Sequence, residues 1–304
     1  MNWLWITLAL MGLIWFGLYL LARGYRNPKR PHRKTPADVG IPFTEVNFPT
    51  QNDCHLYGWW IPVSTPGTHR APVIILMHGW GQNVEFFLPL IEMLHSHGYH
   101  LLAFDARNHG SSDSDGYANM LKFAEDVLAA VNFVVKDFND LTAWIGVIGF
   151  SIGGAAAIYA AASEPQIRRV VTIGAFAHPA EVMKVEFRKR HIPYFPVVWL
   201  LFQFIQLKIG ARFKHIAPMN HIARTTAEIL LIHGTEDKIV PVEQALVLQE
   251  HGNPERTRLW LVEHAGHFDC LNHPEFPRRL NTFLEKGFSL PSAEDSLTQD
   301  ANIG

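Results

Sequence analysis

The feature that most constrains the fold of this chain is an alternation of short apolar runs with helical segments. The runs follow an opening pair of extended segments at 46–50 and 55–63. Continuous runs rich in Val, Ile and Leu are typical of parallel strands whose two faces are both covered by helices. We therefore predict an α/β fold with a mostly parallel central sheet, helices on both faces and an antiparallel opening pair. The predicted strands are 72–79, 99–106, 144–150, 167–175, 228–234 and 258–264, and the predicted helices are 84–97, 121–138, 152–163, 242–251 and 275–286.

The amino-terminal segment 3–22 is apolar and carries no charge over twenty residues. As a helix it would span roughly 30 Å, the thickness of the hydrocarbon core of a bilayer. Trp3 and Trp5 flank one end and Tyr19 the other, where interfacial aromatic residues are common. We predict a transmembrane anchor over 1–22. A cleaved signal peptide fits less well, since no Lys or Arg precedes the run, and a buried helix of a soluble domain is the third interpretation.

Six basic residues and no acid follow this segment up to position 34. Positive charge close to a membrane span favours the cytoplasmic side. We therefore expect a single-pass membrane protein with its amino terminus outside and its globular domain in the cytoplasm. Pro28, Pro31 and Pro36 predict a linker rather than a helix over 23–40. The globular domain is expected over 41–288, and the polar tail 289–304 is expected to be disordered.

The overall composition excludes several classes of protein. Lys and Arg number 26 against 28 Asp and Glu, so nothing in the bulk charge indicates a nucleic-acid partner. The two cysteines, Cys54 and Cys270, are far apart, which argues against a disulfide framework or a cysteine zinc site. We predict no metal and no organic cofactor.

Ser151 is the candidate nucleophile. It lies in Gly149-Phe150-Ser151-Ile152-Gly153, a G-x-S-x-G pattern between the strand 144–150 and a Gly- and Ala-rich helix. A serine on such a sharp strand-to-helix turn is exposed and strained, and only glycine fits beside it. The alternative is an ordinary helix-capping serine with glycines for close packing.

A serine nucleophile needs a base and an acid that orients the base. Glu236 and Asp237 both follow the strand 228–234, and His264 and His267 both follow the strand 258–264. Parallel strands place their carboxyl ends at one edge of the sheet, where ligands bind. The residues alone leave both choices open.

With these motifs the chain resembles the α/β-hydrolase-fold serine hydrolases, and more narrowly their membrane-anchored esterase or serine-aminopeptidase-like branch. The resemblance covers about 41–286, and it implies Asp237 as the acid and His267 as the base. It also implies an oxyanion hole made by the backbone N–H groups of Ile152 and Trp80; a tight strand–helix turn is the alternative role for the segment around Trp80. The matching segments are GWWIP, HGWGQN, FDARNHGSSD, GFSIGG, HGTEDKIVP and AGHFD.

Two further expectations concern residues near this site. The indole of Trp80 stands where many lipases have a small residue, and we predict that it narrows the acyl pocket. His78, His109 and His233 are expected to organise loops rather than to transfer protons.

The alternation breaks between about 176 and 222, where a strongly apolar segment is flanked by basic residues. It is too short for a confident second span. In the family that the chain resembles, an insertion here is usually a lid, so a helical lid over 176–222 is predicted, with Tyr194, Trp199 and Phe202 as candidate substrate contacts. An apolar helix with basic flanks can also lie on an anionic membrane.

These observations predict a serine hydrolase that cleaves a hydrophobic carboxylic ester, with a small or lipid-derived acyl substrate. Cleavage of an amide or peptide, and acyl transfer to an alcohol, are alternatives on the same machinery. A catalytically silent, membrane-tethered interaction module is the interpretation from a different class.

Overall fold

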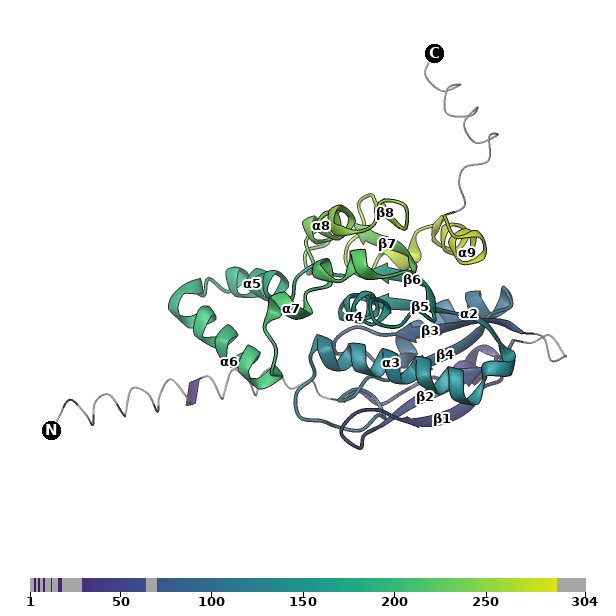
Figure 1. Ribbon diagram of the computed structural model, residues 1–304, viewed down its shortest axis with the longest axis horizontal. Helices are drawn as coiled ribbons and strands as arrows, with labels where there is room; N and C mark the ends of the chain where they lie inside the picture. Colours follow the sequence, from purple (N-terminus) through teal and green to yellow (C-terminus); the bar gives the residue numbers. More distant parts are fainter. Residues whose placement is uncertain are drawn as a thin grey trace, which may run out of the picture.

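The computed structural model describes residues 29–63 and 70–288, together with the single positions 3, 5, 8, 12, 16 and 17. Its centre is an eight-stranded sheet in the order β1-β2-β4-β3-β5-β6-β7-β8 (Figure 1). The pairs β1–β2 and β2–β4 are antiparallel, and every later pair is parallel, as the sequence predicts. The strands are β1 Thr44–Pro49, β2 His55–Ile61, β3 Ala71–Met77, β4 His100–Phe104, β5 Thr142–Phe150, β6 Ile167–Ile173, β7 Glu228–Gly234 and β8 Thr257–Val262.

Helices cover both faces of this sheet and create two separate cores. One core includes α3 (Met120–Asp137), α4 (Ile152–Ala161) and α8 (Glu243–His251). The other includes α2 (Leu88–Ser96) and α9 (Phe276–Lys286). Successive residues of β3 enter opposite cores, because side chains of a strand alternate between its faces. This explains why the strand sequences are apolar without interruption. Short 3₁₀ turns also occur at η2 Val84–Phe87, η3 Asn139–Leu141 and η7 Cys270–Asn272.

The predicted insertion between β6 and β7 is helical. Figure 1 shows its helices α5 and α6 extending from one end of the sheet, away from the helices that cover the faces. Its role as a lid stays a prediction. The elements are α5 Pro179–Lys189, the π turn η4 Tyr194–Val198, α6 Trp199–Ile209, α7 Phe213–Ile216 and the 3₁₀ turns η5 Pro218–Asn220 and η6 Ile222–Arg224.

Within the described residues, no helix is both long and apolar enough to cross a membrane. Most of the predicted span 3–22 lies outside those residues, as does the predicted tail 289–304. The transmembrane anchor and the disordered tail therefore stay predictions.

The described part of the predicted linker, from Lys29 onward, packs on the domain. The sequence predicts no helix in this segment. That prediction is wrong for one turn, because Pro36–Val39 forms the 3₁₀ helix η1. Proline is tolerated at Pro36, the first residue of η1, because the N–H groups in the first turn of a helix have no intrahelical acceptor. Thr35 and Asp38 cap the turn reciprocally, and Gly40 ends it in the left-handed region.

Candidate active site

Ser151 lies on the turn between β5 and α4 with φ 54° and ψ −119°, a strained conformation for a residue with a side chain. Its N–H donates to Ile173 O at 2.8 Å, which ties the turn to β6. A Cβ on Gly149 would lie 2.4 Å from Gly153 O, and one on Gly153 would lie 2.4 Å from Met77 O. Both glycines are therefore required by close backbone approach, which is the geometry that the motif predicts.

Asp237 and His267 meet at the carboxyl ends of β7 and β8. His267 Nδ1 donates to Asp237 Oδ2 at 2.6 Å, and both side chains are buried. The other carboxylate oxygen, Asp237 Oδ1, accepts from the N–H groups of Ile239 and Val240, each at 2.8 Å. The carboxylate is thus fixed by backbone donors and can hold the imidazole in one orientation.

These contacts keep Asp237 ionised. Burial alone would raise the pKa of this carboxyl group. The hydrogen bond and charge of His267, together with the N–H donors of Val240 and Ile239, outweigh burial and place its pKa below the ordinary value. A charged carboxylate in contact with Nδ1 stabilises an imidazolium. Nε2 of His267 has no hydrogen-bond partner among the described residues, so it is the atom available to exchange a proton with a substrate.

The alternative acid and base also pair, but on the surface. His264 Nδ1 lies 3.1 Å from Glu236 Oε1, and their side chains are 88% and 58% exposed. Because water surrounds both side chains, their charges are screened and their interaction is weak. The geometry therefore favours Asp237 and His267, the residues that the resemblance implies.

Gly174, directly after β6, is a site residue that the sequence reasoning missed. Its φ is +65°, and a Cβ there would lie 2.9 Å from His267 Cε1 and 3.0 Å from Nδ1. Its N–H donates to Ile232 O at 2.9 Å, which ties the turn after β6 to the neighbouring strand β7. The imidazole thus rests on a backbone position where only glycine fits. One glycine near the end of the predicted strand 167–175 carries no such signal in the sequence.

Within the described residues, no hydrogen bond joins Ser151 to His267. Such bonds are often long in enzymes without substrate and shorten in the reacting complex. The imidazole is bordered by Phe150, at 4.9 Å between ring centroids, and by Phe268, at 5.1 Å. Phe86 lies 4.7 Å from Phe150 and 6.4 Å from Phe268. These aromatic rings give the surroundings of His267 an apolar character.

The two predicted oxyanion donors lie on turns that contact each other. A Cβ on Gly79 would lie 2.8 Å from the ring of Phe150, so the turn after β3 packs directly on the turn that carries Ser151. Within residues 29–63 and 70–288, neither the N–H of Trp80 nor that of Ile152 has a described acceptor. Two free N–H groups beside a strained serine are the arrangement that an oxyanion hole requires.

Histidines organise this turn, as expected. His109 Nε2 accepts from Gly81 N–H at 3.2 Å, and His78 Nε2 accepts from Ala106 N–H at 3.0 Å. Burial, with the nearby His78, lowers the pKa of His109 to about 3, and burial also lowers the pKa of His78. Both rings are therefore neutral near pH 7 and act as fixed hydrogen-bonding groups. His233 is also buried and its Nε2 donates to Val240 O at 2.8 Å, behind the Asp237 loop.

The segment 29–35, named the strap below, lies across the turns after β3 and β4. His32 Nε2 forms an ion pair with Asp105 Oδ2 at 2.8 Å, and its ring stacks on Tyr57. Asp105 Oδ1 in turn accepts from Val84 N–H at 2.8 Å. Asn83 Nδ2 donates to the carbonyl of Arg30 at 3.1 Å. The strap thus holds the loop that follows Trp80, a contact that no local sequence pattern indicates.

The predicted substrate contacts in the insertion divide into two kinds. Phe202 is buried inside the insertion, 5.4 Å from Phe213 and 6.2 Å from Tyr194 between ring centroids. Tyr194 and Trp199 are exposed. Among the described ring contacts of these three residues, none reaches His267 or Phe150. Their role as substrate contacts therefore stays a prediction.

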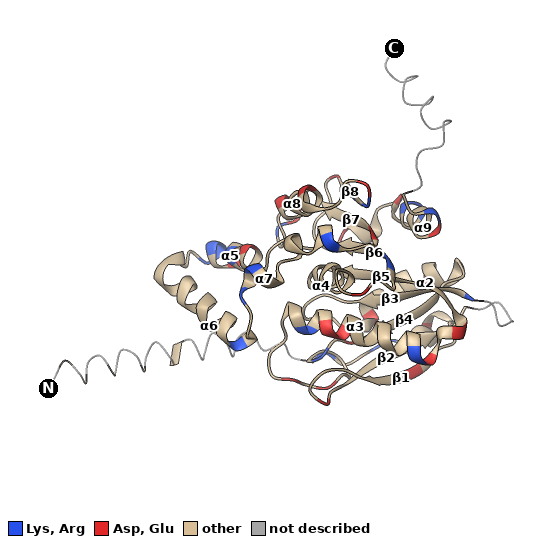
Figure 2. Ribbon diagram, in the orientation of Figure 1, with Lys and Arg blue, Asp and Glu red and all other residues tan. Residues whose placement is uncertain are grey.

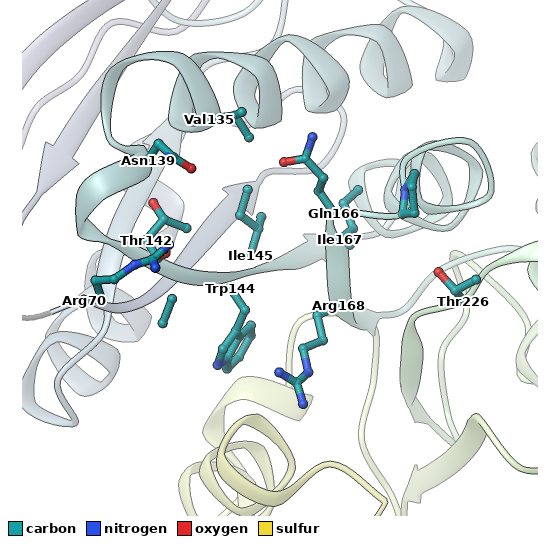
Figure 3. Close-up of a pocket in the computed structure, with 12 residues that line it drawn as sticks. Arg70, Val135, Asn139, Thr142, Trp144, Ile145, Gln166, Ile167, Arg168 and Thr226 are labelled. Atoms are coloured by element: carbon teal, nitrogen blue, oxygen red, sulfur yellow. The ribbon is translucent and has the colours of Figure 1, made fainter.

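A cleft of about 360 Å³ lies at the opposite end of the sheet (Figure 3). Thr142 and Ile145 line it from the amino-terminal half of β5, and Ile167 and Arg168 line it from the start of β6. Ser151 follows the other end of β5, so this cleft takes no part in the candidate site.

Comparison with known proteins agrees with the fold. A family model described as "alpha/beta hydrolase fold" matches residues 72–196. The chain is similar to the YfhR protein of Escherichia coli O157:H7, with 26% identity over 75% of this chain and 74% of that protein. It is also similar to a pimeloyl-[acyl-carrier protein] methyl ester esterase of Xanthomonas campestris, with 34% identity over 35% of this chain and 38% of the esterase. The solved structure of the Pyrococcus furiosus esterase Pf2001 superposes with a TM-score of 0.69 and 25% identity, covering 86% of this chain and 96% of that one.

Proposed function

We propose that this chain, a hydrolase of the α/β-hydrolase fold, cleaves a carboxylic ester with Ser151 as nucleophile, His267 as base and Asp237 as the group that orients His267. The observation that carries the proposal is the buried 2.6 Å contact between His267 and Asp237 at the strand ends beside the strained Ser151 turn. Two of the similar proteins named above are esterases, which supports the ester as substrate.

The proposed reaction proceeds through an acyl-enzyme. His267 Nε2 accepts the proton of Ser151 as Oγ attacks the ester carbonyl carbon. The N–H groups of Trp80 and Ile152 bind the oxyanion, and His267 then protonates the departing alcohol. Water, deprotonated by His267, attacks the acyl carbon and releases the acid. Asp237 remains ionised throughout and stabilises the imidazolium.

A hydrophobic acyl group is the second part of the proposal. Its support is the aromatic border of His267, formed by Phe86, Phe150 and Phe268. Apolar walls bind an acyl chain through removal of its surface from water.

A fluorophosphonate probe and a p-nitrophenyl ester assay test the chemistry. Ser151→Ala abolishes labelling, and Asp237→Asn lowers kcat by roughly 10⁴-fold because the imidazole loses its oriented tautomer. The matched controls are Glu236→Gln and His264→Ala, which remove the neighbouring exposed pair and leave both readouts unchanged. Labelling that persists in Ser151→Ala, or activity lost in the controls, would contradict the assignment. A faster reaction with the matched p-nitroanilide would indicate that the substrate is an amide rather than an ester.

We also propose that the segment 3–22 anchors the chain in a membrane with the catalytic domain in the cytoplasm. The support comes from the sequence, namely twenty uncharged residues followed by six basic ones. Protease digestion of sealed vesicles tests the orientation. The catalytic domain is expected to be digested in inside-out vesicles and protected in right-side-out ones, and the reverse pattern would overturn the topology.

A further inference from the structure

The insertion exposes several large apolar side chains. Phe195 is 72% exposed and Leu207 is 78% exposed, and Trp199 and Leu200 on α6 also face solvent. The opposite side of α6 is buried, since Leu201 and Phe202 pack in the core of the domain. The helix is therefore held by one side while its other side presents hydrophobic groups to the surroundings. We name Tyr194, Phe195, Val197, Trp199, Leu200 and Leu207 the hairpin face.

The charge around this face has one sign. Residues 187–227 contain seven Lys and Arg and no Asp or Glu. Figure 2 shows basic residues on α5, at the end of α6 and near α7. Among the described ion pairs of this stretch, Arg190 is neutralised by Glu186. Lys189 instead donates to Lys238 O at 2.7 Å. Most of the positive charge beside the hairpin face thus lacks an acidic partner among the described ion pairs.

We propose that the hairpin face lies in the headgroup region of an anionic lipid membrane. Its apolar side chains enter the boundary with the acyl chains, while the flanking Lys and Arg contact lipid phosphates. Trp199 and Tyr194 are aromatic types that are enriched at this depth. A second copy of the chain is a poorer occupant, because self-association would bring two positively charged flanks together. The proposal concerns binding alone and does not depend on the reaction at Ser151.

A consequence follows for the site. The insertion begins after the Gly174 turn, and the Lys189–Lys238 contact ties the end of α5 to the loop next to Asp237. Membrane contact at the hairpin face would therefore occur in the same insertion whose helix α5 is directly bonded to the loop of the proposed catalytic acid.

A fluorescent label placed on the hairpin face tests the proposal in the full chain. Both native cysteines are buried, so Leu207→Cys provides a selective attachment point for an environment-sensitive nitrobenzoxadiazole dye. The matched control is Leu246→Cys on α8, a leucine that is 45% exposed and outside the insertion. Each protein is reconstituted in vesicles of phosphatidylcholine, with or without phosphatidylglycerol, and with a quencher carried on the lipid chains.

We expect quenching and a blue-shifted emission at position 207 in the vesicles that contain phosphatidylglycerol, and neither at position 246. Lys208→Glu combined with Arg212→Glu should weaken this contact by at least about fivefold for each charge lost. High salt should weaken it too. A label at 207 that the quencher on the lipid chains does not reach would overturn the proposal. Equal quenching in vesicles without phosphatidylglycerol would overturn it as well. So would a label already buried in detergent, since protein would then cover the face.

Discussion

Replacement of Gly174 by alanine tests whether the backbone beneath His267 positions the imidazole. The new Cβ would lie 2.9 Å from Cε1 and 3.0 Å from Nδ1, whereas ordinary contacts begin near 3.4 Å. The ring must therefore move by roughly 0.5 Å. Because a shift of about 1 Å in a catalytic group can cost roughly 100-fold, we expect kcat/KM for an ester to fall by about 10-fold or more. The contact with Asp237 Oδ2 would be 3.6 Å, so the carboxylate itself is not displaced.

The same substitution also strains the backbone, and a control separates the two effects. Alanine at a positive φ costs about 1–2 kcal/mol, which lowers Tm by roughly 2–8 °C. Gly40 has φ +74° and no atom within 4 Å of its added Cβ, so Gly40→Ala should lower Tm similarly and leave kcat/KM unchanged. The assays are thermal unfolding and ester hydrolysis, normalised to folded protein. Wild-type kcat/KM in Gly174→Ala, or an equal loss in both variants, would refute the reasoning.

Two further outcomes are expected. Trp80→Ala should widen the acyl preference toward longer p-nitrophenyl esters, and an unchanged chain-length profile would exclude Trp80 from the pocket. His32→Gln should destabilise the domain by roughly 1–3 kcal/mol at low pH. Burial lowers the pKa of His32, but the contact with Asp105 and the charges of Glu85 and Glu45 raise it overall above 6.5. The stabilisation is therefore complete below pH 6.5 and is lost as pH rises through the raised pKa. Urea unfolding across this range measures it, and a difference that grows with pH would contradict the assignment.

The strands and the location of the site could be predicted because their signals are local. Buried parallel strands need uninterrupted apolar residues, and the G-x-S-x-G turn needs glycines within five positions. The parallel order then places everything that follows β5, β7 and β8 at one edge. Two adjacent carboxylates, Glu236 and Asp237, could not be separated in this way. Their difference lies in side-chain direction, since Asp237 turns inward onto the N–H groups of Ile239 and Val240.

Gly174 and the strap could not be predicted because their roles depend on distant partners. Gly174 matters through His267, and His32 matters through Asp105, residues far away in the sequence. A glycine after a strand usually indicates only a turn. Gly174 matters because a side chain at this position would displace the ring of His267. This contact depends on the loops after β6 and β8 lying together in space.

The strap changes the meaning of the proline-containing segment before the domain. Prolines indicate a spacer because they lack an N–H and interrupt helices. Because the segment 29–35 forms no helix, its carbonyls are available to other donors, and those of Arg30 and Pro31 both accept from Asn83. His32 then pairs with Asp105, which also binds the N–H of Val84. The segment leading from the predicted anchor is thus bonded to the loop that carries the proposed oxyanion donor. The strap thereby fixes the place at which the described chain enters the domain, directly beside this loop.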